Sequence, residues 1–80
     1  MNDEVTIDTE TQNRWILGDV LPGVHFSTCQ SVRVISGPHV GAVGELISIY
    51  ALTPEPLYHM ETSDGGDLLL CQSALAPLKT

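Results

Sequence analysis

The fold class is decided by residues 30–49, which read QSVRVISGPHVGAVGELISI. The first part of this stretch alternates, because Val32 and Val34 fall on one face of an extended segment and polar side chains fall on the other. Residues 37–44 then bring three glycines and a proline, a composition typical of a turn. We therefore expect two short strands joined by a glycine-rich loop.

The chain beyond this stretch continues the same pattern of short strands and turns. Residues 45–51 are rich in β-branched and aromatic side chains, and residues 57–63 alternate between two faces. The Asp-Gly-Gly-Asp sequence at 64–67 predicts a hairpin turn, since Asp-Gly and Gly-Gly tolerate positive φ angles. Residues 68–72 form the next strand, and residues 77–78 can add a short closing strand. The pattern predicts an all-β meander.

A meander of this size has to curl into a barrel if it is to hide its edges and enclose a core. Leu46 and Ile49 lie three positions apart, so only a bent or bulged strand can aim both side chains inward. Ile47, Leu69 and Cys71 would then point outward and need a cover, either from this chain or from another protein. The expected interior consists of Val32, Val34, Leu46, Ile49, Met60, Leu68, Leu70 and Leu75.

The residues before the meander divide into two segments. Residues 1–13 are polar, and the first ten positions hold four of the ten acidic residues without a cation, so we expect a disordered acidic tail. Residues 14–29 are predicted to be an apolar extended arm, because glycine and proline interrupt them too often for a long helix. The arm is expected to lay Trp15, Leu17 and Phe26 either on the outer face of the barrel or on a partner protein.

Length and charge exclude several classes of function. The chain has 80 residues, with 3 Lys and Arg against 10 Asp and Glu, and a formal net charge of -7. Three cations cannot form the cluster that phosphate binding needs, so bare nucleic acid is not expected as a partner. The acidic start does not read as a signal peptide, and no apolar run approaches the roughly 20 residues of a membrane span. We expect a soluble cytoplasmic protein of one domain, without a membrane partner.

Cys29 and Cys71 are too few for a disulfide framework and are expected to be buried free thiols. A single disulfide, or a zinc site that recruits His25, His39 or His59, stays open as an alternative, although no metal-ligand spacing supports it. No motif for nucleophilic or acid-base catalysis is present. The sequence therefore predicts no enzyme, no catalytic residue, no metal and no cofactor.

Residues 30–49 resemble the KOW motif of transcription-elongation and ribosomal proteins. That motif combines an alternating Val-x-Val strand, a Gly-Pro-x-x-Gly-x-x-Gly loop and a second strand. The matching positions are Val32, Val34, Gly37, Pro38, Gly41, Gly44, Leu46 and Ile49. The resemblance covers roughly residues 30–78 and implies an SH3-like five-stranded antiparallel barrel, which we place at residues 30–80.

The glycine-rich loop differs from RNA-binding KOW loops in the residues between its glycines. KOW loops that bind RNA usually carry Lys or Arg between the glycines, whereas this loop has Val40, Ala42 and Val43, followed by Glu45. Without cations the contacts to phosphate disappear. The family also uses such barrels to dock proteins, and this part of the resemblance is unaffected by the missing cations.

The leading hypothesis is therefore a non-catalytic protein-interaction module with a protein partner, and the acidic surface favours a basic one. The alternative is a small acidic immunity-type inhibitor of a basic toxin nuclease, and RNA binding by a KOW domain ranks third. The contact is expected on the loops at 37–44 and 53–56, since loops commonly carry binding sites. The expected partner-binding residues are His39, Glu45, Tyr50 and Glu55.

Overall fold

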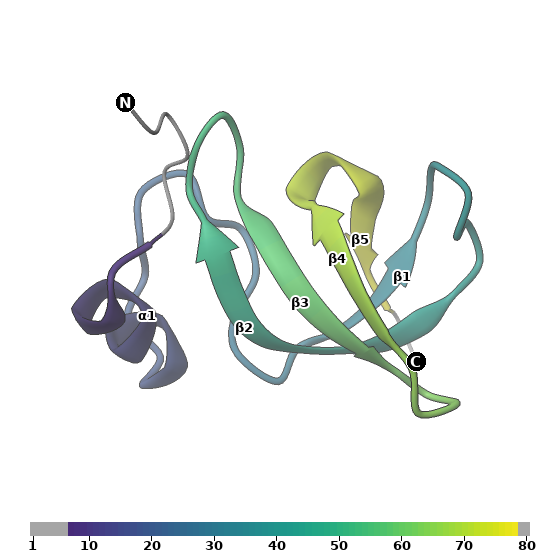
Figure 1. Cartoon of the computed structure of the whole chain (residues 1–80), viewed down its shortest axis with the longest axis horizontal. Helices are drawn as coiled ribbons and strands as arrows, with labels where there is room; N and C mark the ends of the chain where they lie inside the picture. The colour runs from purple at the N-terminus through teal and green to yellow at the C-terminus, as the bar shows by residue number, and fades with distance from the viewer. Residues whose placement is uncertain (1–6, 79–80) are drawn as a thin grey trace.

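The computed structural model describes residues 7–78, which form one antiparallel sheet of five strands preceded by one short helix (Figure 1). The elements are α1 (Thr9–Ile16), β1 (Ser31–Val34), β2 (Val43–Ala51), β3 (Leu57–Thr62), β4 (Asp67–Cys71), the 3-10 turn η1 (Gln72–Ala74) and β5 (Leu75–Pro77). The spatial order of the strands is β4-β3-β2-β1-β5. The all-β prediction is confirmed. None of the helices within residues 7–78 has the length and apolar character of a membrane span.

Strand β2 bends, as the spacing of its apolar side chains predicts. Its pairing with β3 shifts register between Leu46 and Ser48 and again between Ile49 and Ala51. Each shift inserts an extra residue on one strand and turns the following side chains. Leu46 and Ile49 consequently both lie in the core, with no exposed surface.

The glycines of the loop between β1 and β2 are required by its conformation. Gly37 and Gly41 have φ angles of +90° and +97°, in the left-handed region that favours glycine. Gly44 has a different role, because a Cβ at this position would overlap the Glu61 carbonyl on the neighbouring strand. These glycines shape the turn and allow two strands to approach closely.

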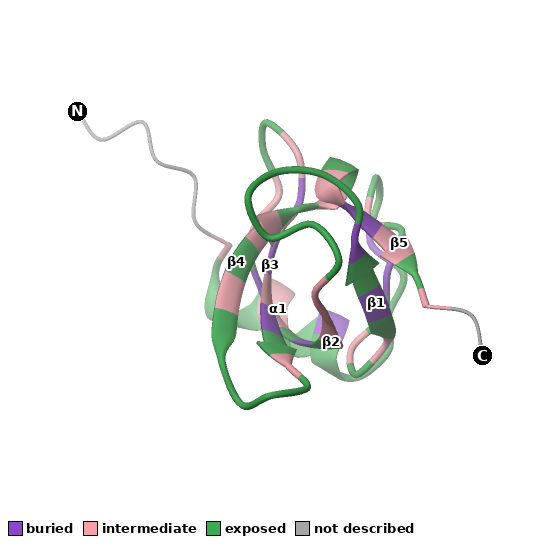
Figure 2. Ribbon diagram, turned by 90° about the vertical axis from the view of Figure 1, so that its right-hand side faces the viewer, coloured by how far each residue is buried: buried purple, intermediate pink, exposed green. Residues whose placement is uncertain are grey.

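The core lies on one face of the curled sheet, where buried residues of the strands pack against buried residues of the N-terminal arm. Figure 2 shows the buried parts of the ribbon in purple. The buried members are Trp15, Leu21, Phe26, Val32, Val34, Leu46, Ile49, Tyr58, Met60 and Leu75. Six of the eight predicted interior residues are in this set. The other two, Leu68 and Leu70, are only partly buried and pack against its edge.

The N-terminal segment differs from the predicted tail. Residues 9–13, expected to be disordered, begin helix α1, and Asp8 caps this helix by accepting a hydrogen bond of 2.7 Å from the Thr11 amide. Hydrogen bonding by the Thr11 side chain, together with the Thr11 amide, lowers the pKa of Asp8. The Ile7 amide also donates to the Tyr50 carbonyl at 3.0 Å, which ties the start of the helix to β2. The rest of the predicted tail, residues 1–6, lies outside the described residues.

The arm packs on the opposite face from the one expected. Trp15 is helical rather than extended, and Trp15 and Phe26 enter the core, whereas Leu17 is 82% exposed. The Trp15 and Phe26 rings contact the Tyr58 ring, with centroid distances of 6.0 and 5.7 Å. The Trp15 indole N–H donates to the Phe26 carbonyl at 2.8 Å, so its polar group is satisfied inside the core. The outer face of the sheet does not receive these aromatic side chains.

Gln72, just after β4, links the arm to the sheet. Its Oε1 accepts hydrogen bonds from the Tyr58 hydroxyl at 2.6 Å and the His25 amide at 2.8 Å. Its Nε2 donates to the Gly23 carbonyl at 3.0 Å. Burial raises the pKa of Tyr58 to about 12. The phenol is therefore protonated at neutral pH and acts as the donor to Gln72.

The prediction of buried cysteines is wrong, because both Cys29 and Cys71 are exposed free thiols. Cys29 has a φ angle of +63°, in the turn that precedes β1. Cys71 ends β4 with its side chain on the outer face, since the alternate residues Leu68 and Leu70 take the inner face.

Replacing Leu46 by alanine is expected to lower the free energy of unfolding by about 2–5 kcal/mol, because shortening a fully buried leucine leaves a cavity. Leu69→Ala is the matched control: Leu69 is 54% exposed, and this variant should differ from wild type by less than about 0.5 kcal/mol. Urea denaturation measures both variants. Equal losses would contradict the assignment of inner and outer faces.

The buried Tyr58 phenol should make stability fall in alkaline solution. Its pKa is raised from 10.0 to about 12, so the unfolded chain releases this proton at lower pH than the folded chain does. Its contribution to the free energy of unfolding is therefore complete below pH 10 and is lost as pH rises from 10 to 12. The urea midpoint of Tyr58→Phe should decline less than that of wild type across this range. Parallel declines would show that Tyr58 titrates normally.

Candidate protein-binding face

The outer face of the sheet, on the side away from the core, leaves apolar side chains open over β2, β3 and β4. Ile47, Tyr50 and Leu69 are 36%, 42% and 54% exposed. Leu69 pairs with His59 across β3 and β4, and the Tyr50 and His59 ring centroids lie 5.9 Å apart. Cys71 continues this surface along β4. We call Ile47, Tyr50, Leu69 and Cys71 the apolar patch.

Three carboxylates cross the same face in one row. Glu45 of β2 is directly opposite Glu61 of β3, and Glu61 is directly opposite Asp67 of β4. All three residues are exposed. Cβ atoms of directly opposite residues lie about 4.5–5.5 Å apart, and like charges at this distance destabilise a sheet. We call Glu45, Glu61 and Asp67 the acidic row.

Within residues 7–78, little positive charge neutralises the acidic row. His59 Nε2 lies 2.9 Å from Asp67 Oδ1, which is an ion pair only when the imidazole is protonated. Arg14 pairs instead with Asp19 near the end of α1, at 3.1 Å. Arg33 lies on β1 opposite Val43 and makes no ion pair with the row in the described part of the chain. The row therefore stays negatively charged.

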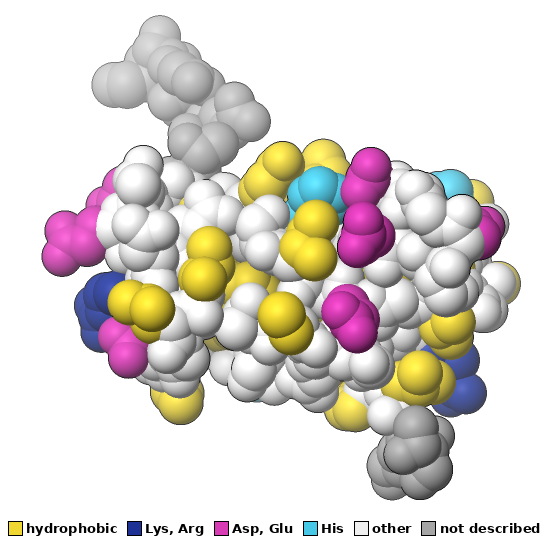
Figure 3. Space-filling view, turned by 90° about the horizontal axis from the view of Figure 1, so that it is seen from below, with side chains coloured by type: hydrophobic (Ala, Val, Ile, Leu, Met, Phe, Trp, Pro, Cys, Tyr) yellow, Lys and Arg dark blue, Asp and Glu magenta, His cyan; other side chains and the backbone are white. Residues whose placement is uncertain are grey.

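Figure 3 shows both features on one surface of the molecule. Acidic side chains stand in a line with a histidine beside them, and hydrophobic side chains spread from this line toward the end that carries α1. An exposed surface with apolar groups beside uncompensated carboxylates is complementary to a partner that is apolar and basic.

The structure places two of the four predicted contact residues on this face. Glu45 belongs to the acidic row and Tyr50 to the apolar patch. His39 lies in the loop before β2 and Glu55 in the loop after it, and these loops stand at opposite ends of a nine-residue strand (Figure 1). The Glu55 carboxylate accepts hydrogen bonds from the Ser73 amide at 2.7 Å and the Ser73 hydroxyl at 3.0 Å. His39 and Glu55 are therefore separated by the length of β2, and Glu55 holds its loop against η1.

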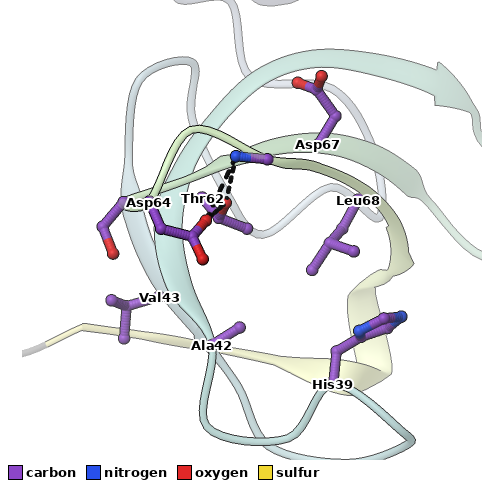
Figure 4. A pocket seen from close by; sticks show the side chains of 9 residues that line it. His39, Ala42, Val43, Thr62, Asp64, Asp67 and Leu68 are labelled. Atoms are coloured by element: carbon purple, nitrogen blue, oxygen red, sulfur yellow. Dashed lines mark hydrogen bonds between the residues drawn. The ribbon is translucent and has the colours of Figure 1, made fainter.

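His39 lines a cavity of about 320 Å³ between the β1–β2 loop and the β3–β4 turn. Figure 4 shows His39 and Leu68 on one side of this cavity and Asp64 on the other. The Thr62 hydroxyl and the Gly66 amide both donate to Asp64, and these hydrogen bonds lower the pKa of its carboxyl group. In the described chain no group of three His, Cys, Asp or Glu residues is placed to hold a metal ion. The hydrogen bonds among Thr62, Asp64 and Gly66 lie within the β3–β4 turn.

The sequence indicated the apolar patch but not the acidic row. Ile47, Leu69 and Cys71 are recognisable as apolar residues on the second face of their strands. The row depends on strand register, which places Glu61 opposite Asp67 across the β3–β4 turn. The sequence does contain a signal for this pairing, because a tight turn at residues 63–66 places the residues on its two sides opposite each other. The pairing of Glu45 with Glu61 depends on the exact register of β2 against β3, which the predicted bend alone does not determine.

No family model, curated protein or solved structure matches the chain, and its function is therefore inferred from its own geometry.

Neutralising the middle of the acidic row is expected to stabilise the protein. Glu61→Gln removes repulsion from carboxylates on both sides and should raise the free energy of unfolding by about 0.2–1 kcal/mol at low salt. The gain should shrink in 1 M NaCl, where the Debye length falls to about 3 Å. Glu10→Gln, in the first turn of α1, is the control, because it removes a charge that favours the helix N-terminus. Urea denaturation should show that this variant has a lower free energy of unfolding than wild type. A change of the same sign in both variants would contradict repulsion within the row.

Proposed function

We propose that the chain is a non-catalytic protein-interaction module, built as a small SH3-like barrel, that binds a basic partner through the outer face of β2, β3 and β4. The observation that carries this proposal is the acidic row beside the apolar patch on one exposed surface. An SH3-like arrangement is supported by the five antiparallel strands, the bent β2 and the glycines that the β1–β2 loop requires.

The two parts of the surface would act differently in binding. Exposed Ile47, Tyr50 and Leu69 offer apolar area, and burying such area supplies most of the favourable free energy of association. The acidic row would orient a basic partner and accelerate its approach, because electrostatic complementarity acts mainly on the association rate and on specificity. A basic partner would also relieve the repulsion among the three carboxylates.

A second candidate function, inhibition of a basic toxin nuclease, is favoured by the same row. Carboxylates held one strand apart on a rigid sheet can enter a cleft lined with cations that otherwise hold phosphates. Under this function, a nuclease encoded beside the gene for this chain would lose activity when mixed with an equimolar amount of it. Glu61→Lys would restore the nuclease activity.

The test of the leading proposal uses a displayed library of random peptides, selected for binding to the wild-type chain. We expect enrichment of sequences that place Lys or Arg beside apolar residues. The binding of these peptides to Glu61→Gln should be at least threefold weaker and less sensitive to salt, because one carboxylate of the row is lost. Glu10→Gln loses the same charge on α1 and should bind like wild type. Chemical shift changes in ¹H–¹⁵N spectra should map to Ile47, Tyr50 and Leu69.

Two results would contradict this proposal. One is equal binding by wild type and Glu61→Gln, which would show that the acidic row takes no part. The other is salt-sensitive retention of single-stranded RNA or duplex DNA in a gel shift near physiological salt, which would restore the RNA-binding role of the KOW family. Neither nucleic acid should be retained, because the described cations form no basic track along the surface.

A further inference from the structure

The two edges of the sheet differ in how well they are protected. The β5 edge has three residues and ends in Pro77, which has no amide hydrogen to offer another strand. The β4 edge has five residues without proline, and its register with β3 runs from Asp67 to Cys71 without a bulge. Natural sheets usually blunt an exposed edge by shortness, proline, lysine or a bulge. The β4 edge has none of these features.

The backbone groups on the open side of β4 can be assigned from the hydrogen-bond pattern. The Thr62 amide donates to Gly66 and the Gln72 amide donates to Pro56, each at 2.8 Å. In an antiparallel ladder the bonded pairs alternate, so Leu68 and Leu70 exchange hydrogen bonds with β3. The amide and carbonyl groups of residues 67, 69 and 71 therefore point away from β3. Among residues 7–78, no group accepts from the amides of residues 69 and 71.

The inner side chains at this edge are also incompletely covered. Leu68 and Leu70 point toward the core but are only partly buried. A cavity of about 320 Å³ opens next to Leu68, between β4 and the loop that carries His39 (Figure 4). One more strand beside β4 would pair the free backbone groups and cover Leu68 and Leu70 at the same time.

We propose that an extended basic segment of the partner protein adds to the β4 edge as an antiparallel strand. This inference rests on the proposed function and specifies how the partner is held. In such pairing, directly opposite residues project to the same face, so the partner residues opposite Leu69 and Asp67 join the outer face. The partner should place an apolar residue opposite Leu69 and a Lys or Arg opposite Asp67. Its alternate residues should be apolar, because they cover Leu68 and Leu70.

The negative charge at the β4 edge favours a basic partner strand over a second copy of the chain. Asp67 begins β4, Asp64 precedes it in the turn, and Glu61 is its neighbour on β3, so negative charge gathers at one end of the edge. Two copies, each with a formal net charge of -7, would repel one another. A basic strand is attracted to the same edge. Main-chain hydrogen bonds then supply affinity and the alternate side chains supply specificity.

The probe is the synthetic peptide acetyl-Lys-Lys-Thr-Val-Ile-Val-Lys-Lys-amide. Its isoleucine is designed to lie opposite Leu69, and the lysine two positions after the isoleucine then lies opposite Asp67. Two derivatives carry a single N-methyl group. Methylation of the isoleucine amide removes a donor that faces β4. Methylation of the following valine amide modifies a group that faces away from β4 and is the matched control. Titrations use the full chain and record affinity together with amide hydrogen exchange.

The expected result is a salt-sensitive complex in which the amides of Leu69 and Cys71 become protected from exchange. Methylation at isoleucine should weaken binding at least tenfold, and methylation at valine less than threefold. Glu61→Gln should weaken binding while the Leu69 and Cys71 amides still become protected in the complex. That combination would support both the added strand and the acidic face.

Three outcomes would overturn strand addition. The first is an equal loss of affinity for the two methylated peptides, without protection of the Leu69 and Cys71 amides. This result would show that the peptide binds the outer face but does not pair with the β4 edge. Absence of peptide binding at millimolar concentration would also overturn the inference. Sedimentation as a dimer with Leu69 and Cys71 already protected would assign the edge to a second copy. If Glu61→Gln binds the peptide as tightly as wild type and the Leu69 and Cys71 amides still become protected, the role of the acidic row in the proposed function is contradicted. The added strand at the β4 edge is then still supported.

Discussion

The packing of Trp15 and Phe26 against Tyr58 is the contact on which the rest of the structure depends. A chain of 80 residues has little apolar surface to bury, and its five strands are short. The arm supplies two large rings to the inner face, and the indole N–H is satisfied there by the Phe26 carbonyl. Because these rings are committed to the core, they cannot cover the outer face. The open apolar patch is thus a direct consequence of how the core is completed.

The parts of the fold that the sequence predicted are those with local signals. Alternation at Val32 and Val34 and the turn residues define strands without knowledge of distant contacts, and the spacing of Leu46 and Ile49 even reveals the bend in β2. The arm was placed on the wrong face because that choice depends on Tyr58, more than thirty positions away in the chain. Helix α1 was missed because its polar composition masks the Asp8 cap, and its single buried residue is Trp15. The acidic row requires register across three strands, and register is a tertiary property.

Two features near β4 have no stabilising role in the isolated chain. The acidic row brings like charges together on neighbouring strands, and the β4 edge leaves backbone groups without partners in the described chain. The opposite edge, with Pro77, is protected, so the two edges of the same sheet differ. Local features that oppose stability without serving the core are expected at functional sites. Their coincidence at β4 supports placing the proposed binding surface at this strand.

The arm also stabilises the strand that is proposed to receive the partner. Gln72 follows β4 directly, and its side chain is bonded to Tyr58, His25 and Gly23. At the other end of β4, the Thr62 amide and hydroxyl are both bonded to Gly66, which fixes the turn. An edge strand held at both ends keeps its extended conformation before binding, so less conformational entropy is lost when a partner strand is added. The same arm that completes the core therefore also helps to hold β4 in the extended conformation that the proposed partner strand requires.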